Sequence, residues 1–331
     1  MKLAFKLFVA AVGLALFVWF VQRAGVGGIV RAFQNLGWFA PVVLLPFALV
    51  YLLDTLGWRF AFGENGVPGV GFGTLVRIRW AGEAINAVLP SAYIGGEATK
   101  VHLLHNLGVP RVQGASSVVA GKTAQVFAQV AFIAIGAVAG AANLPEQSPA
   151  RVGMLAITAM ATCIVASLFW LQQRGMFRTL AALLPLRALR KRAESLRQLD
   201  DRIFEFYRKD RRHFLLSTAT YFGGWMADTI EILLVSHLLR MPIDFSQALA
   251  VEAFIGVAKA LGIFVPGALG VQESGIVFLC YLFGLPPALG VSYAIIRRGR
   301  DVVYAAIGGV FLYAAGLSFR DRMAPIGEAS V

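Results

Sequence analysis

The sequence predicts an all-α polytopic membrane protein with about six full spans and two re-entrant helical hairpins arranged as an inverted repeat. Hydrophobic residues make up 58% of the chain and charged residues only 15%, against about 45–50% and about 25% in soluble domains. Several apolar runs reach the roughly 20 residues that cross a bilayer. Two stretches also resemble each other at a constant spacing of 176 residues. We expect one membrane domain over 1–331.

The repeated stretch runs from residue 89 to 125 and again from 265 to 301. The copies align without a gap, and nine of 37 positions are identical, where chance predicts roughly two or three. Paired segments interrupted by Gly and Pro in two halves of a membrane protein are typical of a transport site. The alternative is two hairpins that are alike in composition only. The expected re-entrant turns contain Pro90, Gly95, Gly96, Pro266, Gly267 and Gly270.

Residues 1–35 are expected to hold the first span, at 1–21, and a loop. A cleaved signal peptide is disfavoured, because no small-residue cleavage site follows the apolar run. Repeat one is expected over 36–142. Its two central pieces are too short and too charged to cross alone, which predicts a re-entrant hairpin. The elements of this repeat are a span at 38–56, the hairpin pieces 70–88 and 98–107, and a span at 116–142.

An extra span and a basic cytoplasmic loop are expected over 143–211. The span covers 152–171, and the segment 174–212 carries twelve Lys or Arg and five Asp or Glu. Within it four apolar residues fall at helical spacing, which predicts an amphipathic helix on the membrane surface or against the bundle. A solvated basic linker is the alternative. The four residues are Leu196, Leu199, Ile203 and Phe206.

The inverted repeat two is expected over 212–318, and a polar cytoplasmic tail over 319–331. The two repeats begin three crossings apart, so the second enters the membrane from the opposite face, which places a shared site near the midplane. The positive-inside rule puts the basic segment, and with it both termini, in the cytoplasm. The elements of this repeat are a span at 214–239, the hairpin pieces 247–265 and 270–283, and a span at 287–318.

Charged side chains inside the expected spans carry the functional prediction. An uncompensated charge at mid-bilayer costs about 2.5–3.5 kcal/mol, so these groups are expected to face one another or water. Short helices broken at proline also point their N-terminal dipoles inward, which favours a phosphate head group. An internal ion-pair scaffold without cargo is the alternative. The expected head-group ligands are Lys122, Arg298, Lys259, Lys100 and Arg297, and the charge-balancing or proton-carrying residues are Glu97, Glu273, Glu252, Asp301, Asp228 and Glu231.

Other classes of function find no support in the sequence. The net charge of +12 lies mainly in loops, so it reports membrane topology and not nucleic-acid binding. Cys163 and Cys280 fall in apolar segments, where neither a disulfide framework nor a metal site is expected. No phosphate-binding glycine loop, zinc-protease motif or nucleophile elbow occurs, so we expect no cofactor and no enzyme activity.

The two signature stretches resemble the flippase-like membrane domain of lysylphosphatidylglycerol synthases and their stand-alone relatives, over about residues 36–318. The chain departs from the family pattern at four places. Glu97 replaces the usual Asp, and Lys100 replaces the usual Arg. Gly121-Lys122 stands where Glu-Arg is common, and Gln125 stands where Asp is common. The resemblance implies a bacterial inner-membrane protein without lipid lysylation, closest to the branch of hopanoid synthesis clusters. The matching positions are Asn86, Pro90, Gly95, Gly96, Glu97, Lys100, Gly108, Val109, Pro110, Lys122, Pro266, Gly267, Gly270, Glu273, Gly284, Pro286 and Arg298.

Three hypotheses follow. The first is a flippase that moves a phospholipid- or hopanoid-type lipid between leaflets. The second is an intramembrane enzyme that modifies lipids with its carboxylates as acid and base. The third is an assembly factor whose basic segment 174–212 recruits lipid-biosynthesis enzymes. Membrane lipids are the expected partners in each.

Overall fold

The computed structural model describes residues 36–64, 66–67, 69–88, 93–183, 193–262 and 270–315, together with Gly27, Val30, Gln34 and Ala268. The expected first span at 1–21 and the tail at 319–331 lie outside the described residues, as do Pro90, Pro266 and Gly267. Every regular element in the described part is helical. The elements are η1 Gly37–Val43, α3 Leu44–Phe60, α4 Phe72–Val88, α5 Ile94–Asn106, α6 Arg111–Ala142, α7 Pro149–Gln173, α8 Met176–Leu183, α10 Ala193–Lys209, α11 Arg211–Leu238, α12 Phe245–Leu261, α13 Val271–Leu282 and α14 Pro287–Ala314.

Three helices in the described part are long and apolar enough to cross a membrane. They are Gly37–Phe60, which joins η1 to α3, then α6 and α7. The helices α11 and α14 have 28 residues each, or about 42 Å at 1.5 Å per residue, but charged side chains interrupt their apolar sequence. The prediction of an all-helical fold is therefore confirmed, and three of its helices have the length and composition of membrane spans.

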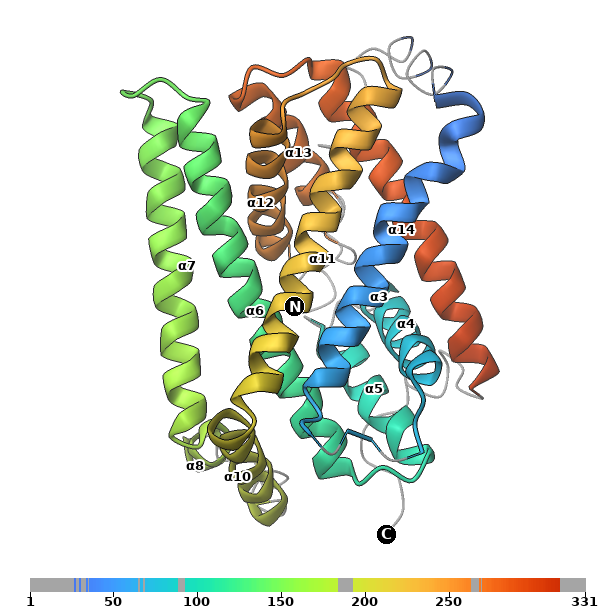
Figure 1. Ribbon diagram of the computed structural model, residues 1–331, viewed down its shortest axis with the longest axis vertical. Coiled ribbons are helices and arrows are strands. Elements are labelled where there is room, and N and C mark those ends of the chain that lie inside the picture. Colours follow the sequence, from blue (N-terminus) through green and yellow to red (C-terminus); the bar gives the residue numbers. More distant parts are fainter. Residues whose placement is uncertain are drawn as a thin grey trace, which may run out of the picture.

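Two pairs of short helices lie between the long ones. α4 and α5 have 17 and 13 residues, and α12 and α13 have 17 and 12. Each is about 26 Å long or less, which is shorter than the hydrocarbon core of roughly 30 Å. The pairs lie at opposite ends of the bundle, α4 and α5 in the lower half of Figure 1 and α12 and α13 in the upper half.

Glycine lets the first short pair approach closely. Gly96, in the first turn of α5, packs directly on Gly82 of α4, and a Cβ at position 96 would overlap the Gly82 carbonyl oxygen. The Gly96 N–H also donates to Asn86 Oδ1 at 2.9 Å, which satisfies an N–H that the start of a helix leaves unpaired. The start of α5, and thus the side chain of Glu97, is fixed against α4.

The second short pair fixes its own helix start differently. Gly270 has φ +79°, a conformation that favours glycine, and its N–H donates to Glu273 Oε2 at 2.7 Å. Glu273 lies in the first turn of α13, as Glu97 lies in the first turn of α5. A carboxylate at this place is stabilised by the positive end of the helix dipole.

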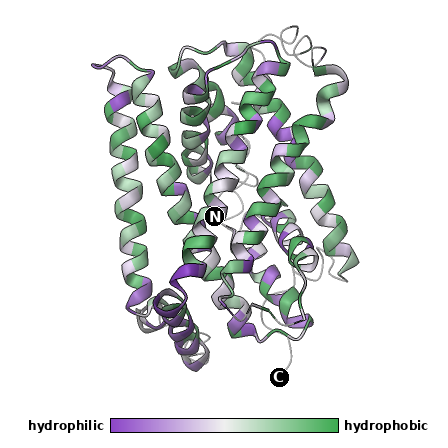
Figure 2. Ribbon diagram, in the orientation of Figure 1, coloured by the Kyte–Doolittle hydropathy of each residue, from purple (hydrophilic) through white to green (hydrophobic). Residues whose placement is uncertain are grey.

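The basic segment is helical where it is described, as α8 and α10, and α10 is the strongly hydrophilic helix at the lower left of the molecule in Figure 2. Leu199, Ile203 and Phe206 of α10 are buried, and α10 packs on α6 and α11. The Asp200 carboxylate accepts the backbone N–H groups of Phe177 and Arg178, at 3.1 and 2.9 Å, and so ties α8 to α10. The expected amphipathic helix against the bundle is confirmed.

Tyr207 attaches α10 to α7. Its hydroxyl donates to Gln172 Oε1 at 2.8 Å. Burial raises the pKa of Tyr207 to about 12, so the hydroxyl keeps its proton at neutral pH and remains a donor.

Candidate functional site

Six charged side chains from α3, α4, α5 and α6 form a continuous set of ion pairs, which we call the first ionic network. Arg79 Nη2 lies 2.6 Å from Asp54 Oδ2. Lys100 Nζ lies 3.0 Å from both Glu83 and Glu97. The network has equal numbers of acids and bases, so its charges balance. Its members are Asp54, Arg79, Glu83, Glu97, Lys100 and Lys122.

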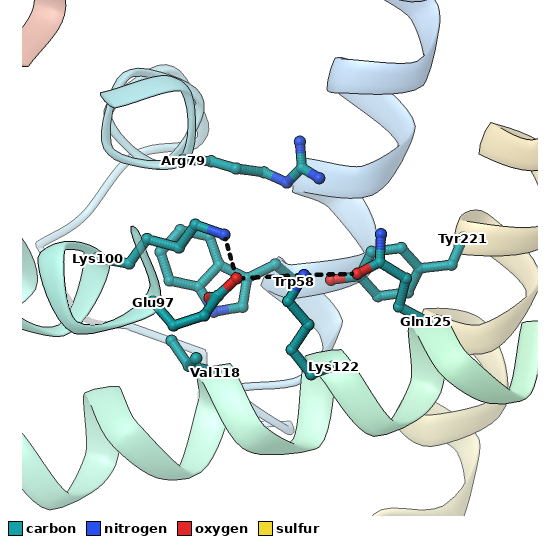
Figure 3. Close-up of a pocket in the computed structure, with 8 residues that line it drawn as sticks. All are labelled: Trp58, Arg79, Glu97, Lys100, Val118, Lys122, Gln125 and Tyr221. Carbon is teal, nitrogen blue, oxygen red and sulfur yellow. Dashed lines mark hydrogen bonds and ion pairs between the residues drawn. The ribbon is translucent and has the colours of Figure 1, made fainter. Parts of the chain in front are cut away.

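Lys122 is the accessible cation of this network. Its side chain is 37% exposed, whereas the side chain of Lys100 is 5% exposed. Figure 3 shows the ammonium groups of Lys100 and Lys122 converging on the Glu97 carboxylate, and Lys122 also reaching Gln125. Lys122 Nζ is 3.2 Å from Glu97 Oε1 and 3.0 Å from Gln125 Oε1.

A small cavity of about 10 Å³ lies beside Lys122. This volume corresponds to about one water molecule. Polar side chains dominate its wall, and its apolar part comes from Trp58, Val118 and the Tyr221 ring. The lining residues are Trp58, Arg79, Glu97, Lys100, Val118, Lys122, Gln125 and Tyr221.

Eight charged side chains from α11, α12, α13 and α14 form the second ionic network. Arg297 Nη1 lies 2.7 Å from Glu252 Oε2 and Arg298 Nε lies 2.6 Å from Glu273 Oε1. Arg300 bonds to Glu231 and lies 2.8 Å from Asp301 and 3.5 Å from Asp228. The members are Asp228, Glu231, Glu252, Glu273, Arg297, Arg298, Arg300 and Asp301.

An aromatic contact joins the two networks. The guanidinium of Arg79 lies 5.3 Å from the Tyr51 ring centre, and that of Arg300 lies 3.4 Å from the Phe47 ring centre. The two rings are 5.2 Å apart in an edge-on arrangement. Cations over ring faces are stabilised by the ring quadrupole, so α3 contributes to both networks with neighbouring aromatic side chains.

One motif occurs in both networks at the spacing of 176 residues. In the first, Lys122 contacts Glu97 and Gln125. In the second, Arg298 contacts Glu273, and its Nη1 lies 4.0 Å from Asp301. Each cation is on a long helix, and each glutamate begins a short one. The repeat in sequence is therefore also a repeat in contact geometry.

The structure places the remaining predicted residues around these networks. Lys259 of α12 interacts electrostatically with Asp301. Gly95 and Gly96 lie in the first turn of α5, and Gly270 precedes α13. Arg297 is only 5% exposed and is paired with Glu252. It is therefore buried, in contrast to the accessible Lys122. Head-group binding by Lys122, Arg298, Lys259, Lys100 and Arg297 stays a prediction.

Three members of the first network are missing from the residues predicted as ligands. Asp54, Arg79 and Glu83 have apolar or differently charged residues 176 positions later, so the repeat does not mark them. Their signal is different: Arg79 and Glu83 are four residues apart in one helix, which places both on one face.

A helical bundle with membrane-length helices and ionic networks enclosed between them defines the class as a polytopic membrane protein. The chain belongs to the family of the lysylphosphatidylglycerol synthase TM region, whose family model matches residues 4–309. This confirms the resemblance at the level of the family, which is associated with membrane lipid handling. No curated protein and no solved structure gives a significant match.

Proposed function

We propose that the protein is a lipid flippase that moves a phospholipid- or hopanoid-type lipid with an anionic head group between the leaflets of the bacterial inner membrane. The observation that carries this proposal is the repeated contact of a glutamate with a cation, Glu97 with Lys122 and Glu273 with Arg298. A pair of this kind can bind an anion, because a lipid phosphate can replace the carboxylate as the partner of the cation.

Lys122 is the first contact for the head group in this proposal. It is the most exposed cation of the ion pairs in both networks, and the cavity of about 10 Å³ adjoins it. That cavity has no room for a head group while Glu97 holds Lys122. Binding therefore requires the ion pair between Glu97 and Lys122 to break. The ion pair between Glu97 and Lys100 remains, so the Glu97 carboxylate stays neutralised.

The membrane arrangement belongs to the same proposal. The short pairs α4–α5 and α12–α13 would be re-entrant hairpins that enter from opposite faces, as expected of an inverted repeat. Their lengths and their positions at opposite ends of the bundle support this arrangement. With α8 and α10 on the cytoplasmic side, six spans leave both termini in the cytoplasm.

A translocation assay in reconstituted vesicles tests the proposal. Purified protein is inserted into vesicles that contain tail-labelled phosphatidylglycerol, and an impermeant quencher measures the label that reaches the outer leaflet. Wild-type protein is expected to speed this transfer above that of protein-free vesicles. Lys122→Ala is expected to lower the rate about 10-fold or more, because a charged hydrogen bond contributes about 1.5–3 kcal/mol.

Two control variants separate loss of the cation from general damage. Lys122→Arg keeps the charge and is expected to retain most of the rate. Lys209→Ala removes an exposed lysine on α10 and is expected to leave the rate unchanged. Wild-type rates equal to those of empty vesicles would contradict the flippase proposal, and a chemically altered lipid in the same vesicles, detected by mass spectrometry, would favour the enzyme hypothesis.

A further inference from the structure

Five side chains where α11, α12 and α14 meet are sealed from solvent and hold unequal numbers of acids and bases. We call them the acid-rich cluster: Asp228, Glu231, Glu252, Arg297 and Arg300. Each is 5% exposed or less. Three acids face two bases, so one negative charge is left over if every group is ionised. An uncompensated charge in such a place costs several kcal/mol.

Neighbouring charges in the part of the chain that the structure describes do not remove this excess. Arg300 also pairs with an acid outside the cluster, because its Nη2 lies 2.8 Å from Asp301 Oδ1. Arg298 donates a hydrogen bond to Glu273. Lys259 of α12 interacts electrostatically with Asp301, which also lies outside the cluster. The accessible lysine of α6, Lys122, pairs with Glu97 in the first network. Among the described residues, aromatic groups also face the cluster: Phe47 and Tyr51 on α3, and Tyr293 and Tyr304 on α14.

A second, independent observation is that one oxygen of each acid has no hydrogen-bond partner among the described residues. These atoms are Asp228 Oδ1, Glu231 Oε1 and Glu252 Oε1. Arg300 Nη1 lies 3.5 Å from Asp228 Oδ1, which is an ion-pair distance without a hydrogen bond. A buried acceptor without a donor costs about 1–3 kcal/mol. A proton on one of the three carboxyl groups would supply a hydrogen-bond donor and would also cancel the excess negative charge.

We propose that the acid-rich cluster is a proton-binding site that holds one proton, shared among Asp228, Glu231 and Glu252. A proton fits better than a metal ion. In the part of the chain that the structure describes, no group of three or more His, Cys, Asp or Glu side chains is arranged to hold a metal. The two arginines within the cluster would also repel a larger cation.

The site is placed to couple proton binding to lipid movement, an extension that rests on the proposed flippase function. Arg298 lies between Arg297 and Arg300 on α14, and it carries the second copy of the repeated contact. Loss of the proton leaves an extra negative charge that holds Arg297 and Arg300, and thus α14, more tightly. Uptake of the proton weakens that hold and frees Arg298 to move.

Infrared difference spectroscopy of the full-length protein in lipid nanodiscs tests the site without any transport. The carbonyl-stretch band of a protonated carboxylic acid is recorded while the pH is raised from acidic to alkaline. Wild-type protein is expected to keep one such band at neutral pH. Asp228→Asn, Glu231→Gln and Glu252→Gln are each expected to abolish it, because two acids then match two arginines. Glu205→Gln, on the exposed face of α10, is expected to leave it unchanged.

Several results would overturn the proposal. If the band is absent from the wild-type protein at neutral pH, the proposal is wrong. This result does not depend on whether the variants fold. Persistence of the band in all three single variants also overturns the proposal, because the proton would then lie elsewhere. Loss of the band on addition of sodium at constant pH would identify a sodium site instead. A band that behaves as expected in a protein that moves no lipid would support the site and reject the flippase function.

Discussion

The two ionic networks share one motif and differ in almost everything around it. The first has three acids and three bases and an accessible lysine. The second has five acids and three arginines, and most of its members are sealed. Arg297 and Arg300 correspond to Gly121 and Ala124 in the first half. The contact of a glutamate with a cation is kept in both, and the proposed function assigns head-group binding to this contact.

Removing a base from the sealed network is expected to have the largest effect on stability. Arg300→Ala leaves Glu231 and Asp228 buried without their partner, which costs about 3–5 kcal/mol of unfolding free energy. Lys122→Ala removes a half-exposed ion pair and is expected to cost about 1 kcal/mol or less. Thermal unfolding in detergent measures both. Equal losses would contradict the distinction between a sealed and an accessible network.

The way each half fixes its glutamate gives a second, smaller difference. Gly96→Ala places a Cβ against the Gly82 carbonyl and is expected to destabilise the protein by about 1–3 kcal/mol. Gly309→Ala on α14 is the matched control, because a Cβ there meets nothing within 4 Å. The midpoint of thermal unfolding should fall for the first variant only. Similar midpoints for both would show that α4 and α5 are not held together at Gly96.

Gln125 marks a third difference, because the second copy of the motif has Asp301 at this place. Gln125→Glu puts another carboxylate beside Lys122, where it competes with an anionic head group. We expect the translocation rate to fall about 3- to 10-fold, which corresponds to roughly 1 kcal/mol. Gln198→Glu on the exposed face of α10 makes the same chemical change at a distance and should leave the rate unaltered. A rate unaffected by Gln125→Glu would place the head group away from Lys122.

Much of the fold follows from the sequence, because apolar length and Gly or Pro breaks are local signals. The expected pieces 70–88 and 270–283 correspond closely to α4 and α13. The position of α6 is less exact, because the helix begins at Arg111, directly after Pro110, and not at 116.

The sequence predicts many of the charged residues of the site, but it predicts their pairings only in the repeated part. The pairing of Glu97 with Lys122 is indicated by the repeat, since a glutamate and a cation recur 176 positions later as Glu273 and Arg298. The pairing of Arg300 with Glu231, 69 residues away, depends on how α11 and α14 are rotated about their axes. Periodicity shows which residues share a face of one helix, but it does not give the rotation of one helix against another.

The double variant Lys122→Ala/Arg298→Ala tests the central claim most directly. Both copies of the repeated contact lose their cation, while Glu97 keeps its partner Lys100. The translocation rate of labelled phosphatidylglycerol is measured in vesicles that contain equal amounts of folded protein. The account predicts a rate equal to that of protein-free vesicles. A rate equal to that of the wild-type protein would contradict it.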